Sequence, residues 1–150
     1  MALNIIELRI GSWVEYRNDY YQVCSINKDK IGITKKGNLT KTTFEARLDQ
    51  LNGIRFNTEI LRNLQGYVSK DTETLSNCYL VSLQEITQMG NPIDWSLSFR
   101  ELEGSWWVNI EESSVTFETI GEGEFYYLHD LQNIISSLIY CDIVWKRNSI

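Results

Sequence analysis

Hydrophobic and polar residues alternate through much of the first sixty positions, which is the pattern of short β-strands. Ile6, Leu8 and Ile10 alternate with charged residues and predict a first strand. The turn signal Asn18-Asp19 separates two aromatic-rich runs and predicts a hairpin. The expected strands of this region after the first are Trp13–Tyr16, Tyr20–Ile26, a run through Ile31 and Ile33, and Leu39–Phe44. Strands of this number and spacing predict a small SH3-like barrel.

A short helix is expected after this region, between Asn57 and Gly66. Asn57 or Thr58 can cap it, because their side-chain oxygens accept amide hydrogens of the first turn. Glu59 suits the first turn of a helix dipole, and Gly66 can adopt the conformation that ends a helix. Its apolar face would consist of Ile60, Leu61 and Leu64.

Residues 68–77 are polar and turn-like, so they are the best candidate for a loop or for a boundary between two halves. The halves would be residues 1–66, which resemble a barrel, and residues 78–150. Because the polar stretch is short, a single domain over residues 1–150 is expected.

The second half predicts an antiparallel meander. Its clearest strand has Trp95, Leu97 and Phe99 alternating with polar residues, so that one face is buried and the other is wet. Gly121 and Gly123 mark an expected turn. The remaining strands are expected at 79–83, 106–110, 115–119 and 125–128.

One amphipathic helix is expected at 130–140 and should cover this meander. Its apolar stripe consists of Leu131, Ile134, Ile135, Leu138 and Ile139. Asp130 or His129 can cap its start, and Cys141–Trp145 predicts a final strand. The fold class is therefore α+β, mainly antiparallel β.

The composition is that of an ordinary globular chain of 150 residues. Its three cysteines lie far apart and there is one histidine, so we expect free thiols in a reducing compartment, no metal and no cofactor. Neither a secretory leader nor an apolar run of membrane-spanning length is visible, which predicts a cytoplasmic protein with no membrane partner.

Charge is distributed unevenly around a net charge of −6. Residues 1–62 contain ten Lys/Arg and seven Asp/Glu, whereas residues 63–150 contain four and thirteen. Five of the seven lysines form a candidate basic patch: Lys28, Lys30, Lys35, Lys36 and Lys41. They favour a solvated hairpin whose lysines protect an edge strand, with a phosphate-facing or acidic-partner surface as the alternative.

Enzyme motifs are missing from the sequence, so no catalytic residue is assigned and a non-enzymatic protein is expected. Cys141 and His129 would lie roughly 18 Å apart along one helix, which excludes a nucleophile–base pair. His129 itself favours a structural place at a helix start, with a general base or ligand contact as the alternative. The glutamate pairs of the second half favour solvated turns.

Trp106 and Trp107 are neighbours on an expected strand and must therefore face opposite ways. Burial is the first interpretation of the second tryptophan, and an aromatic platform for a partner is the alternative. The same two interpretations apply to Tyr20 and Tyr21, and to Tyr16, in the first hairpin.

Two stretches resemble short phage- and prophage-type proteins of gut bacteria. Residues 7–14 (ELRIGSWV) are similar to an ELRIGNWV opening, and residues 127–134 (YLHDLQNI) to a YVHQLQNLY stretch near the end of those proteins. Residues 56–61 are a looser match to an IPLTEEIL stretch, and residues 136–142 depart from the family ending. The resemblance implies a small accessory protein of a mobile element and brings no catalytic residue. It directs attention to the polar residues Arg9, His129 and Gln132.

Three functions remain open. The first is an accessory factor that binds a host or phage protein, since tryptophan, tyrosine and arginine supply most interface energy. The second is a protein that binds or sequesters a nucleotide. The third, disfavoured by net charge, is nucleic-acid binding through the Lys28–Lys41 hairpin. Oligomeric state is left open.

Overall fold

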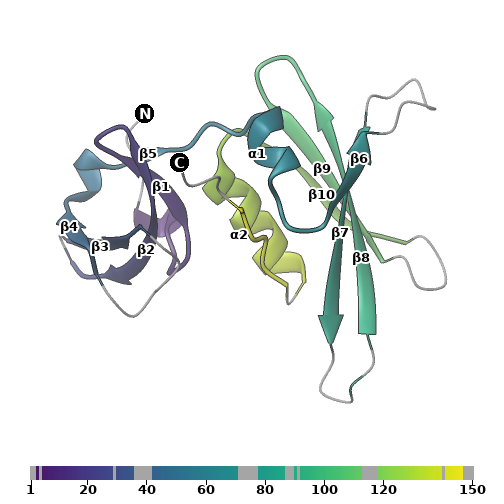
Figure 1. Cartoon of the computed structure of the whole chain (residues 1–150), viewed down its shortest axis with the longest axis horizontal. Helices are drawn as coiled ribbons and strands as arrows, with labels where there is room; N and C mark the ends of the chain where they lie inside the picture. Colours follow the sequence, from purple (N-terminus) through teal and green to yellow (C-terminus); the bar gives the residue numbers. More distant parts are fainter. Residues whose placement is uncertain are drawn as a thin grey trace. The chain divides into compact units, whose positions relative to one another are not determined.

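The computed structural model describes residues 3, 5–28, 30–35, 42–70, 78–86, 90, 92–112, 118–139 and 141–146. The chain divides into two compact units. Unit 1 comprises Met1–Arg55 and Tyr127–Asn133, and unit 2 comprises Phe56–Tyr126 and Ile134–Ile150. The division thus falls before the short helix, not in the polar stretch after it. Both units are mainly antiparallel β, as the sequence predicted (Figure 1).

Unit 1 is built on a five-stranded sheet in the order β4-β3-β2-β1-β5. Two short 3-10 helices, η1 (Ile5–Glu7) and η2 (Leu48–Gln50), accompany it. The strands are β1 (Trp13–Tyr16), β2 (Asp19–Ile26), β3 (Ile31–Thr34), β4 (Phe44–Ala46) and β5 (Asn52–Gly53). The expected closed SH3-like barrel is not confirmed, because the sheet remains open.

The first hairpin is confirmed, but its turn lies one residue earlier than expected. Tyr16 pairs with Asp19, so the two turn residues are Arg17 and Asn18. Both have positive φ, 50° and 62°, as the twist-matched two-residue hairpin turn requires. The sheet buries an aliphatic and tyrosine core that includes Val14, Val23, Ile31, Ile33 and Leu51.

Two expected strands of unit 1 are wrong. Residues 5–7 form η1, and its neighbours Ile6 and Ile10 are 84% and 54% exposed while Leu8 is buried, so the alternation does not mark a sheet face. Backbone groups here bind side chains instead: Asn133 Nδ2 donates to Glu7 O at 2.8 Å. The expected strand Leu39–Phe44 is displaced, because β4 begins at Phe44; residues 39–41 lie outside the described residues.

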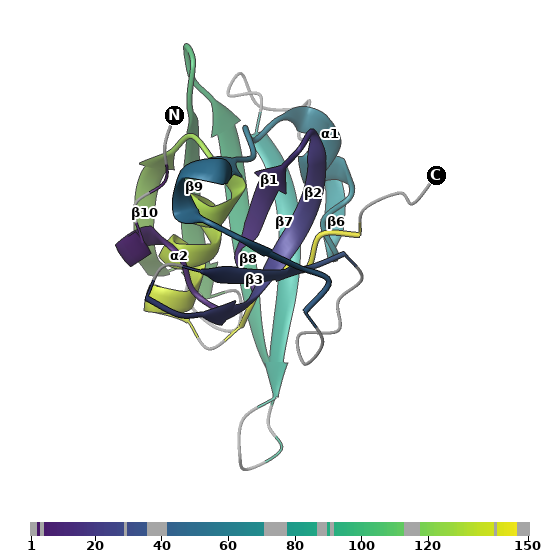
Figure 2. The same ribbon diagram turned by 90° about the vertical axis from the view of Figure 1, so that its left-hand side faces the viewer.

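Unit 2 contains a second five-stranded sheet in the order β10-β9-β8-β7-β6, with every neighbouring pair antiparallel. The strands are β6 (Tyr67–Lys70), β7 (Cys78–Ile86), β8 (Pro92–Glu101), β9 (Trp106–Glu112) and β10 (Glu118–Phe125). β7 and β8 run side by side as a long hairpin (Figure 2). The predicted meander is therefore confirmed, with β6 added at one edge.

Two α-helices are described, α1 (Thr58–Arg62) and α2 (Leu128–Leu138). Asn57 caps α1 as predicted, because its Oδ1 accepts from Ile60 N at 2.9 Å. The helix ends at Arg62, earlier than the expected Gly66, which lies in the turn before β6. α2 begins two residues before the expected start, and Asp130 Oδ2 accepts from Tyr127 N at 3.2 Å, as in a capping box.

One face of the second sheet is covered by α1 and by the part of α2 that belongs to unit 2 (Figure 1). An aromatic cluster forms its core. The Phe56 ring lies 5.8 Å from Phe99, 5.2 Å from Trp106 and 4.9 Å from Phe125, measured between centroids. Such offset and edge-on ring pairs stabilise a core beyond the area that they bury.

Gly121 and Gly123 lie inside β10, so the turn expected there is wrong. The reason is the approach of α2 to the strand. A Cβ on Gly121 would collide with Leu138 Cδ1, whereas a Cβ on Gly123 would make an ordinary contact of 3.5 Å with Ile134 Cδ1. Glycine in a strand often marks such a close approach.

Two other expectations end differently. The polar stretch 68–77 begins with three residues of β6, and residues 71–77 lie outside the described residues. The strand expected at Cys141–Trp145 is reduced to a single bridge between Trp145 and Leu64, supported by Gln65 N donating to Val144 O at 2.8 Å.

Candidate functional site

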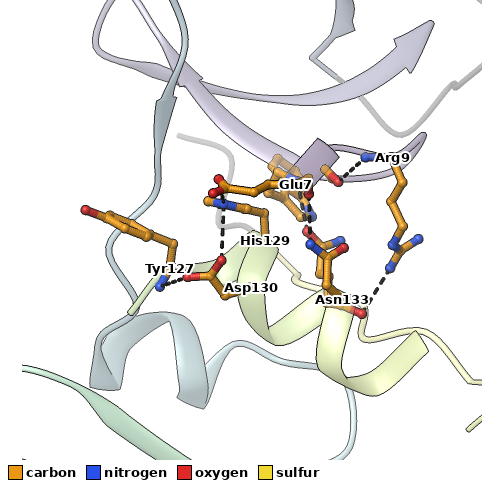
Figure 3. A network of polar contacts seen from close by, with 9 residues as sticks. Glu7, Arg9, Tyr127, His129, Asp130 and Asn133 are labelled. Carbon is orange, nitrogen blue, oxygen red and sulfur yellow. Dashed lines mark hydrogen bonds and ion pairs between the residues drawn. The ribbon is translucent and has the colours of Figure 1, made fainter. Parts of the chain in front are cut away.

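Arg9, His129 and Gln132, the polar residues singled out from the sequence, come together in unit 1 (Figure 3). The chain from η1 to the start of β1 supplies Arg9. The first turns of α2 supply the other two residues. What these side chains contact decides whether they form a binding site.

Gln132 is 1% exposed and hydrogen-bonds the backbone at the start of β1. Its Oε1 accepts from Trp13 N at 2.9 Å, and its Nε2 donates to Gly11 O at 2.9 Å. The helix side chain thus satisfies backbone groups that would be costly to bury without partners. This is a structural role, and it occupies both ends of the amide.

Arg9 is half-buried beside the same helix. Its Nη2 donates to the backbone oxygen of Gln132 at 3.3 Å, and its own N–H donates to Ser12 Oγ at 3.0 Å. The guanidinium therefore helps to hold the chain that precedes β1 against α2.

His129 is fully buried. Its Nε2 lies 3.4 Å from Glu7 Oε2 and 3.3 Å from Asp130 Oδ1, and its ring stacks on Tyr127 at 5.6 Å between centroids. Among the described residues, Nδ1 has no hydrogen-bond partner. β5 closes in from another side, since a Cβ on Gly53 would lie 3.0 Å from His129 Cε1. The imidazole is thus enclosed, with carboxylates on its one bonded nitrogen.

The predicted basic patch is only partly described. Lys30 Nζ lies 3.8 Å from Glu45 Oε2, and Lys35 Nζ lies 2.7 Å from Asp19 Oδ2. Lys28 is exposed, whereas Lys36 and Lys41 lie outside the described residues. The contacts with Glu45 and Asp19 suit lysines on a solvated hairpin.

The tyrosines of the first hairpin lie differently from one another. Tyr21 is buried and packs on Tyr16, at 6.0 Å between centroids, and on Phe44, at 5.8 Å. Tyr20, next in sequence, is half-buried. Phe44 is 44% exposed and was missed as a surface aromatic, because the sequence placed it at the end of a strand.

Trp106 and Trp107 face opposite ways, as the sequence required. Trp106 is 5% exposed and belongs to the aromatic core, so it is not on a binding surface. Trp107 is half-buried on the other side of the sheet, which we call the outer face of unit 2. There it lies directly between Arg100 of β8 and Glu124 of β10 in one row across the strands.

The outer face carries more negative than positive charge. Its described charged residues are four carboxylates and one guanidinium: Asp94, Glu111, Glu122, Glu124 and Arg100. The carboxylates are held by polar neighbours. Ser105 Oγ donates to Glu124 Oε1 at 2.6 Å, and Asn109 Nδ2 donates to Glu111 Oε1 at 3.2 Å. Sequence reasoning assigned these glutamates to turns; period-two alternation along β9 and β10 was the available signal.

The small residues Ser96 and Ser98 lie beside this row, on β8. Ser98 is directly opposite Asn109 of β9, which in turn is opposite Glu122 of β10. The middle of the outer face is therefore lined by short polar side chains, and a partner can approach the strands closely there.

Metal and membrane features are negative within their limits. No group of three His, Cys, Asp or Glu in the described part of the chain is arranged to hold a metal ion. Cys24 is buried, Cys78 and Cys141 are half-buried, and all three are free thiols. In the described ranges, neither helix has the length and apolar character to cross a membrane.

Comparison of this chain with protein-family models, curated proteins and solved structures finds no significant match. The resemblance of residues 7–14 and 127–134 to phage- and prophage-type proteins stays a prediction.

Proposed function

We propose that this protein is a non-enzymatic accessory factor that binds another protein through the outer face of unit 2. The observation that carries the proposal is the row Glu124–Trp107–Arg100 across three adjacent strands. Tryptophan and arginine are the residue types that most often dominate interface energies. Trp107 contributes to this face while its neighbour Trp106 secures the core behind it.

The charge of the outer face specifies the kind of partner. Four carboxylates against one guanidinium favour a basic protein surface, and like-charged partners would be disfavoured. Complementary charge also raises the rate of encounter. The resemblance in unit 1 supports a setting on a mobile element, where such a partner would be a host or phage protein.

The rival functions receive less support from the residues proposed for them. Nucleotide binding relied on Arg9 and His129, but His129 is buried and faces Glu7 and Asp130, whose carboxylates would repel phosphate. Nucleic-acid binding relied on lysines of which Lys30 and Lys35 lie against carboxylates.

Affinity capture from a bacterial lysate, quantified by mass spectrometry, tests the proposal. Wild type is compared with Trp107→Ser and with Tyr126→Ser, which removes an aromatic residue of unit 2 that is 46% exposed and lies beyond β10. We expect a protein captured by wild type and by Tyr126→Ser to be lost about thirtyfold in Trp107→Ser, the effect of a typical hot spot. Equal recovery with all three proteins would contradict this function, provided that circular dichroism shows the variants to be folded.

A further inference from the structure

We propose that the free edge of β10 binds an extended segment of the partner, in which basic and apolar residues alternate. The inference rests on the proposed function and names the chemistry of its partner. Extended segments commonly add to an exposed sheet edge, with backbone hydrogen bonds giving affinity and alternate side chains giving specificity.

The first observation is the position of β10. It is the outermost strand of its sheet and pairs only with β9. The hydrogen bonds found among the described residues leave the other edge of β10 unpaired. An edge of this kind presents a row of N–H and C=O groups that can pair with another strand.

The second observation is that β10 is protected against its own copies but not against a basic strand. Its register shifts between Thr119 and Gly121, and Glu122 and Glu124 stand beyond the shift. Bulges and edge charges are the usual devices against edge-to-edge aggregation. The regular stretch from Gly121 to Phe125 remains available, and its carboxylates repel an identical strand while they attract lysine or arginine.

The third observation is the difference between the two faces of β10. Glu122 and Glu124 lie on the outer face, whereas Gly121 and Gly123 lie on the face covered by α2. A strand added at the usual spacing of about 4.8 Å would place alternate side chains on the two faces. Those on the outer side would meet the carboxylates. Those on the inner side would extend past the glycines toward Leu138, which is 38% exposed, and therefore suit apolar residues.

A dye-labelled synthetic peptide of alternating lysine and leucine provides the probe, with binding measured by fluorescence anisotropy. Two derivatives carry N-methyl groups, one on every lysine amide and the other on every leucine amide. Because successive N–H groups of a strand point to opposite edges, each derivative blocks one edge of the peptide. We expect one derivative to bind at least tenfold more weakly than the parent peptide and the other to bind like the parent. A peptide of the same composition in which all lysines precede all leucines should also bind at least tenfold more weakly.

Variants of the protein place the site. Glu122→Gln combined with Glu124→Gln should weaken binding of the parent peptide at least tenfold. Asp94→Asn removes a carboxylate of the same face on β8 and should change it less than twofold. Strand addition is overturned if the parent peptide does not bind, if both methylated derivatives bind as well as the parent, or if Asp94→Asn weakens binding as much as the double variant. Loss of lysate capture in Trp107→Ser alongside any of these results would leave the proposed function standing without the edge.

Discussion

The side-chain amide of Gln132 accepts a hydrogen bond of 2.9 Å from the backbone N–H of Trp13, across a separation of 119 residues. A residue on a helix thereby serves as the partner of a strand at its first residue. The residue types that resemble the phage-type motifs at the two ends of the chain meet here. Their proximity gives these residues a structural explanation that requires no ligand.

Replacing Gln132 with alanine should lower the free energy of unfolding by about 1–3 kcal/mol, the usual cost of leaving a buried polar group without its partner. Amide hydrogen exchange at Trp13 should accelerate at the same time. Asn133→Ala is the matched control, since its Nδ2 bonds Glu7 O at an exposed site and should cost less than about 1 kcal/mol. Equal effects in urea unfolding would show that burial of the Gln132 amide does not matter.

The two glycines of β10 should respond differently to alanine. Gly121→Ala places a methyl group against Leu138 and should destabilise the protein by about 1–3 kcal/mol, as overpacking does. Gly123→Ala makes only an ordinary contact with Ile134 and should be neutral or slightly stabilising. Thermal unfolding of the two variants in parallel checks this, and a reversed order would contradict the packing of α2 on β10.

The neighbouring tryptophans should separate stability from binding. Trp106→Ala empties a core position and should cost about 3–5 kcal/mol. Trp107→Ala changes the outer face and should cost less than about 1 kcal/mol. Urea unfolding followed by circular dichroism measures both. A large loss for Trp107 would indicate that this side chain is needed for folding, and that its effect on capture cannot be assigned to a partner.

A nucleotide panel tests the rival use of the polar residues in unit 1. We expect mono-, di- and cyclic nucleotides to leave the melting temperature unchanged, because the buried His129 faces two carboxylates. A ligand that binds the folded state raises the melting temperature with its concentration. A saturable rise that disappears in Arg9→Ala would restore nucleotide binding as the leading function.

Much of the fold followed from local pattern. The stripe at Leu131, Ile134 and Ile135 predicted α2 to within two residues of each end. Alternation at Trp95, Leu97 and Phe99 predicted β8 and which of its faces is buried. These succeeded because the period of an element depends on the residues within it. The same reasoning failed at residues 5–10, where side chains of α2 and not strand partners bind the backbone.

The candidate site was less predictable from sequence. The pattern required Trp106 and Trp107 to point in opposite directions, but it did not say which one the core would take. Packing decided that, by placing Phe56 against Trp106. The outer face was likewise hidden, because Arg100, Trp107 and Glu124 are adjacent only once three strands are in register.

The sequence by itself determined the element types, the dominance of antiparallel strands and the uneven charge, since each depends on composition or on neighbours a few positions apart. Only the tertiary structure decided that Gly121 lies within a strand, that Gln132 completes the start of β1, and that Trp107 faces outward. Each of these depends on contacts between residues distant in the chain, which a local period cannot encode.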